Sequence, residues 1–115
     1  MDLESLCKKV MDLDPKIRFA GIINDKGRLV AGGMREGMKP LESSKDREML
    51  FMELALRVKM RKEFDKQFGA VKFAMSYREK CIIMSFPLEN NILYVSANAS
   101  LDFKKNSLTI LKILH

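Results

Sequence analysis

The chain has 115 residues, of which 47% are hydrophobic and 31% are charged, and its formal net charge is +6. These fractions are ordinary for a globular protein, and the length suits one modest core but not two, so we expect a single domain over residues 1–115. No apolar run approaches the roughly 20 residues that cross a bilayer, and the N-terminal MDLESLCKKV lacks the pattern of a secretory signal, which predicts a cytoplasmic protein.

The first third of the chain predicts one helix followed by a β-hairpin. Apolar residues within 3–13 recur at spacings of three and four, and an Asp-Pro pair ends this helix because the residue before a proline disfavours the α region. Two apolar runs follow, at 17–24 and 28–34. The turn between them contains Gly27, which adopts a positive φ at low cost, so the two runs are predicted to pair as antiparallel strands.

A polar loop and a long helix come next. Residues 35–45 contain a glycine and a proline, and we expect this loop to be mobile and to form contacts, with Met34 and Met38 at its edge. A serine at position 43 or 44 is a good N-cap for a helix over 46–68, which has no internal proline or glycine.

The apolar stripe of this helix is wider than packing on one sheet face requires. One row recurs every four residues, from Met52 through Leu56 and Met60 to Phe68, and a second row flanks it. A helix with apolar residues on more than one face usually has a second surface to bury. The pattern therefore predicts self-association through this helix.

The last third predicts three strands and a terminal helix. Residues 71–78 alternate apolar and polar, residues 81–86 are almost all apolar and stop at Pro87, and residues 92–97 form the third run. A helix follows over about 101–114. The order α-β-β-α-β-β-β-α predicts an α+β fold with one five-stranded antiparallel sheet, because a lone hairpin is marginally stable and has to join the later strands.

The inventory of reactive residues argues against an enzyme, a metal site and a bound cofactor. The sole histidine is His115, the last residue, so a Ser-His or Cys-His nucleophile pair is not expected. Cys7 and Cys81 sit among apolar neighbours, and we interpret them as small buried hydrophobes. No phosphate-binding or calcium-binding loop pattern occurs in the sequence.

Positive charge is concentrated between residues 57 and 80, where eight basic residues face three acids. Such a segment favours an acidic partner, and the residues we expect to meet it are Arg57, Arg61, Lys62 and Lys72. Binding to nucleic acid through the same segment is an alternative. It is disfavoured because the cations spread around the helix and the aromatic residues lie on its apolar faces.

The element order, with the stretch FAGIINDKGRLVAGG after a helix ending in Asp-Pro, resembles the roadblock, or dynein light chain, family of the longin and profilin-like group. The resemblance implies a homodimer in which the long helices lie side by side and the strand after them pairs with its twin. It also implies a scaffold, or a partner that is a small GTPase or another roadblock-like chain. An alternative with a similar layout is a PAS-like small-molecule sensor. The expected dimer residues are Met52, Leu56, Met60, Phe73 and Met75.

Overall fold

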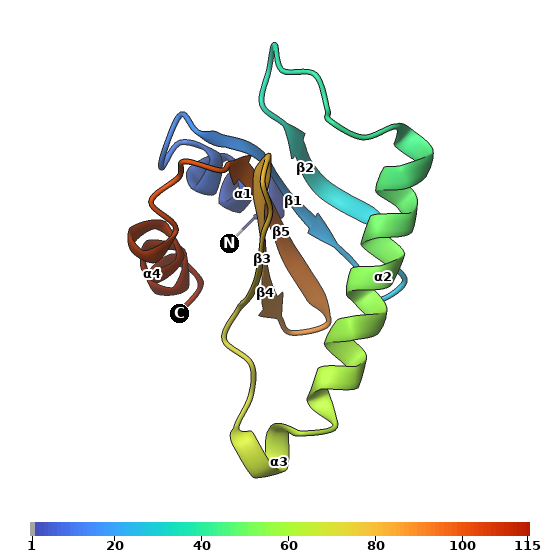
Figure 1. The fold of residues 1–115 in the computed structure, drawn as a ribbon. Coiled ribbons are helices and arrows are strands. Elements are labelled where there is room, and N and C mark those ends of the chain that lie inside the picture. The colour runs from blue at the N-terminus through green and yellow to red at the C-terminus, as the bar shows by residue number, and fades with distance from the viewer. Residues whose placement is uncertain (1) are drawn as a thin grey trace.

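The structure is a computed structural model that describes residues 2–115 (Figure 1). One five-stranded sheet runs through the middle of the molecule, and helices lie on both of its faces. The elements are α1 (Leu3–Met11), β1 (Ile17–Ile23), β2 (Leu29–Met34), α2 (Ser44–Lys62), α3 (Asp65–Phe68), β3 (Ala74–Tyr77), β4 (Cys81–Leu88), β5 (Asn91–Asn98) and α4 (Phe103–Leu114).

The strands lie in the order β2-β1-β5-β4-β3, and every neighbouring pair is antiparallel. The first hairpin joins the later strands through β1 and β5, where Ala20 lies opposite Val95. This confirms the predicted α+β fold and its five-stranded antiparallel sheet. The edges of the sheet are β2 and β3.

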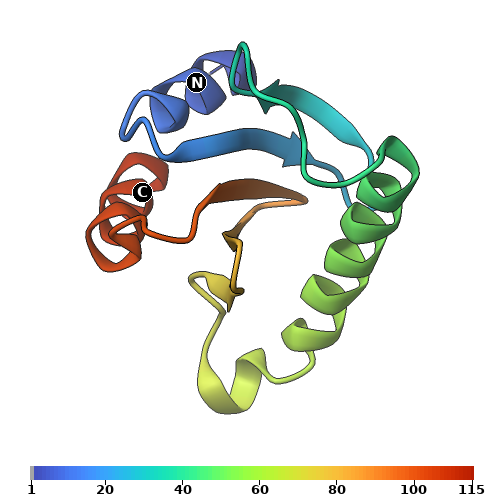
Figure 2. The same cartoon turned by 45° about the horizontal axis from the view of Figure 1, so that its top comes forward.

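Each face of the sheet has its own hydrophobic cluster. Figure 2 shows α1 and α4 on one side of the sheet and α2 on the other. On one face, α1 and α4 pack on the central strands, and Val10, Ile82 and Ile110 are fully buried there. On the other face, α2 packs through Phe51 against Phe19 and Tyr94, whose three ring centroids lie 5.1 to 5.9 Å apart. This aromatic cluster fixes which side of α2 faces the sheet.

Two helix starts and the first turn follow their local sequence. Ser43 caps α2 by accepting a hydrogen bond from the backbone N–H of Asp46, as expected for a serine N-cap. The β1–β2 turn has Gly27 at a φ of 78°, and the side chain of Asn24 accepts two backbone N–H groups within the turn. Helix α4 begins two residues later than predicted because Asp102 provides its cap.

The long helix ends earlier than predicted, at Lys62 instead of residue 68. The N–H groups of Glu63 and Phe64 bond to carbonyls three residues back, which tightens the last turn, and the chain then turns into the short α3. Phe64 and Phe68 stack on each other with their centroids 6.1 Å apart. The aromatic residues at this end therefore do not extend the sheet-facing surface of α2.

Two strand limits also differ from the predictions. β3 is confined to four residues, and its Met75 and Tyr77 are exposed because it is an edge strand. β4 continues through Pro87, which pairs with Ile92 of β5. A proline is tolerated there because β3 begins with Ala74 opposite Ser85, so no strand lies beside Pro87 on that side to need its N–H.

Arg35 joins the start of the sheet to α1. Its guanidinium donates hydrogen bonds to the carbonyl oxygens of Met11, Ile17 and Asp14 at 2.6, 2.8 and 2.9 Å. The loop that begins at Arg35 is thus anchored at its first residue. Within residues 2–115, no helix has the length and apolarity that a membrane crossing requires.

A candidate interaction surface on α2

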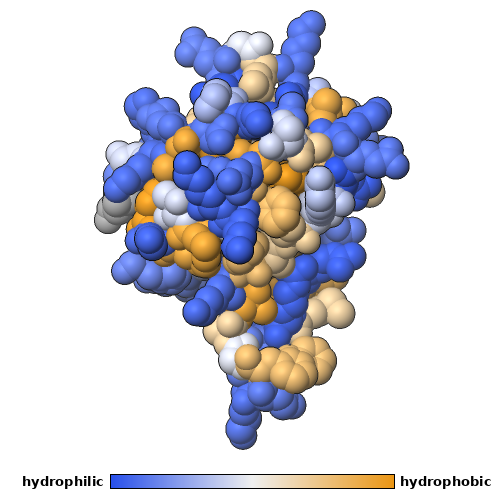
Figure 3. Space-filling view, turned by 60° about the vertical axis from the view of Figure 1, so that its left-hand side comes forward, coloured by the Kyte–Doolittle hydropathy of each residue, from blue (hydrophilic) through white to orange (hydrophobic). Residues whose placement is uncertain are grey.

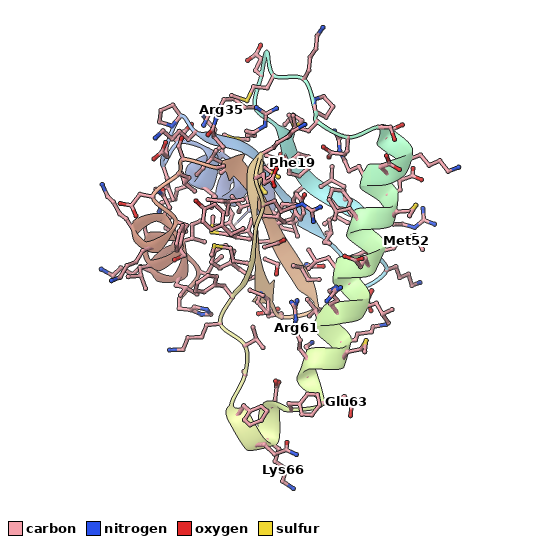
Figure 4. All side chains as sticks on the ribbon, in the orientation of Figure 1. Phe19, Arg35, Met52, Arg61, Glu63 and Lys66 are labelled. Carbon is pink, nitrogen blue, oxygen red and sulfur yellow. The ribbon has the colours of Figure 1, made fainter. Side chains whose placement is uncertain are left out.

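Helix α2 has two apolar faces. Phe51, Ala55 and Val58 are buried against the sheet. A row of large apolar side chains on the other side of the helix is exposed: Met49 (63%), Met52 (61%), Leu56 (59%) and Met60 (59%). Figure 4 shows Met52 directed away from the sheet. We call this row the methionine row.

The methionine row continues beyond the end of α2. Phe64 and Phe68 are 54% and 83% exposed, and apolar side chains protrude at the lower end of the molecule, where α3 lies (Figure 3). Scattered single apolar residues are normal on a protein surface, whereas a continuous apolar row indicates a site of contact. Methionine suits such a site because its flexible side chain adapts to different partners.

A groove of about 400 Å³ lies beside the methionine row, between α2 and the strands β3 and β4. Three arginines line it, Arg57 and Arg61 from α2 and Arg78 from the end of β3. Figure 4 shows Arg61 on the side of α2 that faces this groove. Glu53 is the one carboxylate among the lining residues, and its Oε1 lies 3.5 Å from Nε of Arg57. Both side chains of this pair are about 60% exposed (59% and 62%), so the pair adds little stability to the isolated chain.

The structure divides the expected dimer residues into two groups. Met52, Leu56 and Met60 lie together in the methionine row. Met75 is exposed at the sheet edge, whereas Phe73 is half-buried and stacks on Phe86 with the ring centroids 5.5 Å apart. Phe73 therefore packs on the hydrophobic cluster beneath α4.

The four basic residues expected to meet an acidic partner are also separated. Arg57 and Arg61 share the groove. Lys62 lines a different, small hollow with Asp65, and Lys72 lies in the irregular segment before β3. Sequence reasoning missed Arg78 as part of this cluster. The sequence did contain a pattern that could have found it. Arg78 follows Ser76 by two positions, and side chains two positions apart along a strand lie on the same face, which here is the groove side.

The buried Cys7 thiol and Tyr94 hydroxyl are both held in their protonated, unreactive forms. Burial raises the pKa of the Cys7 thiol to about 11, and it also raises the pKa of the Tyr94 hydroxyl. A thiol held protonated in this way is a poor nucleophile. Over residues 2–115, no group of three or more His, Cys, Asp or Glu side chains is placed to hold a metal ion.

The sensor alternative calls for an apolar cavity between the sheet and the long helix. The groove between α2 and the sheet is instead lined by several exposed side chains, and the guanidinium groups of three arginines form part of its walls. Its polar floor includes Ser76 and Ser85. This character differs from the mostly apolar enclosure typical of small-molecule pockets.

Residues 1–115 match a family described as a family of unknown function, DUF6659. The chain belongs to this DUF6659 family. No curated protein matches the chain.

Solved structures with the same fold include roadblock domains and profilins. The Roadblock/LC7 domain from Streptomyces avermitilis matches with a TM-score of 0.70 and 13% identity over 98% of this chain and 94% of that chain. The gliding protein MglB from Thermus thermophilus matches with a TM-score of 0.66 and 14% identity over 96% of this chain and 86% of that chain. Another MglB structure is described as having a tetrameric arrangement. Profilin from Schizosaccharomyces pombe matches with a TM-score of 0.66 and 13% identity over 98% of this chain and 93% of that chain. At these identities the likeness shows the fold, and it confirms the resemblance to the roadblock and profilin-like group.

Proposed function

We propose that this DUF6659 protein is a non-enzymatic interaction module, which forms a homodimer and serves as a scaffold or regulator that docks a small GTPase. The observation that carries the proposal is the methionine row, whose side chains remain about 60% exposed (59–63%) although they are large and apolar. The open edge strand β3 adds a second surface next to it.

The size of the methionine row is compatible with a weak to moderate dimer. Fully burying such a side chain stabilises by about 1.5–3 kcal/mol, so covering the exposed part of each contributes about 1 kcal/mol. Two copies of four residues then contribute about 8 kcal/mol, against an association cost of about 4–15 kcal/mol. Pairing of β3 with its counterpart would add backbone hydrogen bonds, since edge strands offer unpaired N–H and C=O groups.

The resemblance to roadblock domains supports the same arrangement. In that family the long helices lie side by side and the following strand pairs with its twin, which in this chain corresponds to α2 and β3. The tetrameric arrangement given for one MglB structure shows that a neighbour of this fold self-associates. The small-GTPase partner follows from the roadblock resemblance, with the dimer surface and the loop before α2 as the expected contacts.

Sedimentation equilibrium of the wild type and of Leu56→Asp tests the dimer. Because Leu56 is 59% exposed, the variant is expected to keep its circular dichroism spectrum and to become a monomer. Leu108→Asp is the matched control, since Leu108 is 52% exposed on α4, on the opposite face of the sheet. A Leu56→Asp protein that dimerises as well as the Leu108→Asp protein would contradict the use of this surface.

Calorimetric titration with purified small GTPases of the source organism tests the docking role. Each GTPase is loaded with GDP or with a non-hydrolysable GTP analogue. We expect one of them to bind with a preference for one nucleotide state and to bind Leu56→Asp more weakly. Absence of binding by every GTPase in both states would refute this part of the proposal and leave the dimer unaffected.

A further inference from the structure

Two copies that meet along α2 bring together surfaces that carry more positive than negative charge. Each groove beside α2 has three arginines and a single carboxylate, that of Glu53. Like charges at an interface weaken association unless opposite charges are placed against them. The position of Glu53 is therefore decisive for how two copies can pack.

Glu53 lies at the border of the methionine row and the groove, because it lines the groove with Arg57 and Arg61 and also a shallow hollow with Leu56 and Met60. Met49, Glu53, Leu56 and Met60 are separated by four, three and four residues, which is the spacing of a helix–helix contact seam. All four are exposed. A polar residue in the middle of such a seam costs some stability and selects one register and orientation of the helices.

Glu53, Arg57 and Arg61 form a neighbouring stripe, each four residues after the last. In a parallel pair of helices, Glu53 would meet its own copy and so would Arg57. In an antiparallel pair related by a two-fold axis near residues 55–57, Glu53 of each copy instead faces Arg57 or Arg61 of the other. A closed two-fold dimer makes every such contact twice.

We infer that Glu53 is the residue that sets the register of self-association, by pairing with Arg57 or Arg61 of a second copy across an antiparallel α2–α2 contact. The inference rests on the proposed homodimer. Within a single chain, Glu53 and Arg57 lie 3.5 Å apart. When two copies meet, this pair would separate, and Glu53 of each copy would pair with an arginine of the other.

Charge-reversal variants test the pairing through the dimer dissociation constant. Glu53→Arg removes two intermolecular pairs and creates two repulsions, so we expect self-association to weaken about tenfold or more. Glu48→Arg is the control, because it makes the same change of charge at an exposed position of α2 outside the seam.

Mixing experiments identify the partner residue. Glu53→Arg mixed with Arg57→Glu, or with Arg61→Glu, is expected to form a heterodimer in preference to either homodimer, as read by native mass spectrometry. Preference for one of the two mixtures supports the inference and names the arginine. Equal weakening by Glu53→Arg and Glu48→Arg, or no preference in either mixture, would overturn the pairing while the homodimer stands. A wild type that stays monomeric at millimolar concentration would overturn the homodimer as well.

Discussion

Arg35 is predicted to be the side chain outside the hydrophobic clusters that contributes most to stability. Its guanidinium donates to three carbonyl oxygens, at the end of α1, in the following turn and at the first residue of β1. Arg35→Met keeps much of the aliphatic volume and removes all three donors. The three carbonyls then lose a charged partner at a site that is only partly open to water.

The expected loss is about 3–4 kcal/mol. A hydrogen bond from a charged donor contributes about 1.5–3 kcal/mol, and three of them would reach at least 4.5 kcal/mol if no water replaced the guanidinium. Partial access of water to the freed carbonyls reduces this figure. Against a typical total of about 5–15 kcal/mol, such a loss would lower the melting temperature by about 10–15 °C.

Urea unfolding followed by circular dichroism measures this loss, and the Leu56→Asp background prevents self-association from hiding it. Arg18→Met is the control, because Arg18 donates one exposed hydrogen bond, to the carbonyl oxygen of Lys39 at 2.8 Å. We expect the control to lose less than about 1 kcal/mol, because this bond is exposed and water takes the place of the guanidinium at the carbonyl oxygen of Lys39. If Arg35→Met were no less stable than Arg18→Met, the three short contacts would not be holding α1 to the sheet.

Three further outcomes follow from the geometry. Gly32→Ala should fail to fold, because the φ of Gly32 is 77° and an added Cβ would lie 2.2 Å from the carbonyl oxygen of Ala20; Gly33→Ala, which has free space, should give normal yields of folded protein. The pKa of Cys7 is raised to about 11, so the unfolded thiol ionises first, and the free energy of unfolding should fall as the pH rises from about 9 through 11. Urea titrations of wild type and Cys7→Ala over that range check this, since the variant should lack that part of the fall. Self-association measured by sedimentation should strengthen when salt rises from about 50 to 500 mM, because three arginines face one carboxylate in each groove and salt screens their repulsion; weakening with salt would contradict a net repulsive interface.

The parts of the fold that sequence predicted well are those in which neighbouring residues decide the structure. The Asn24–Gly27 turn and the serine cap of α2 depend on interactions over a few residues, and the structure has them. The alternation over residues 71–78 predicted a longer, half-buried strand, whereas β3 covers four residues and its Met75 and Tyr77 are exposed. The element order then allowed few arrangements, because the hairpin needed further strands to pair with. The five-stranded sheet therefore followed from local patterns and one packing rule.

The parts that sequence missed depend on contacts between distant segments. Nothing local ends α2 at Lys62, since no proline or glycine occurs before Gly69. Arg78 joins Arg57 in one groove only because β3 lies beside α2 in space. The same is true of Arg35, whose three acceptors lie 18 to 24 residues away along the chain.

The widest ambiguity in the sequence lay in α2, where apolar residues occupy two faces. A pattern alone does not say whether Phe51 or Leu56 faces the core, and the ring cluster with Phe19 and Tyr94 settles it in favour of Phe51. Once that face is occupied, the sheet has no further room for Leu56, which is left 59% exposed. Exposed apolar side chains that do not pack in the chain's own core contribute to stability only when a second surface covers them. The charges beside them then bear on which surface fits. Glu53, which lies 3.5 Å from Arg57 of its own chain, is the residue that we expect to favour an antiparallel second copy.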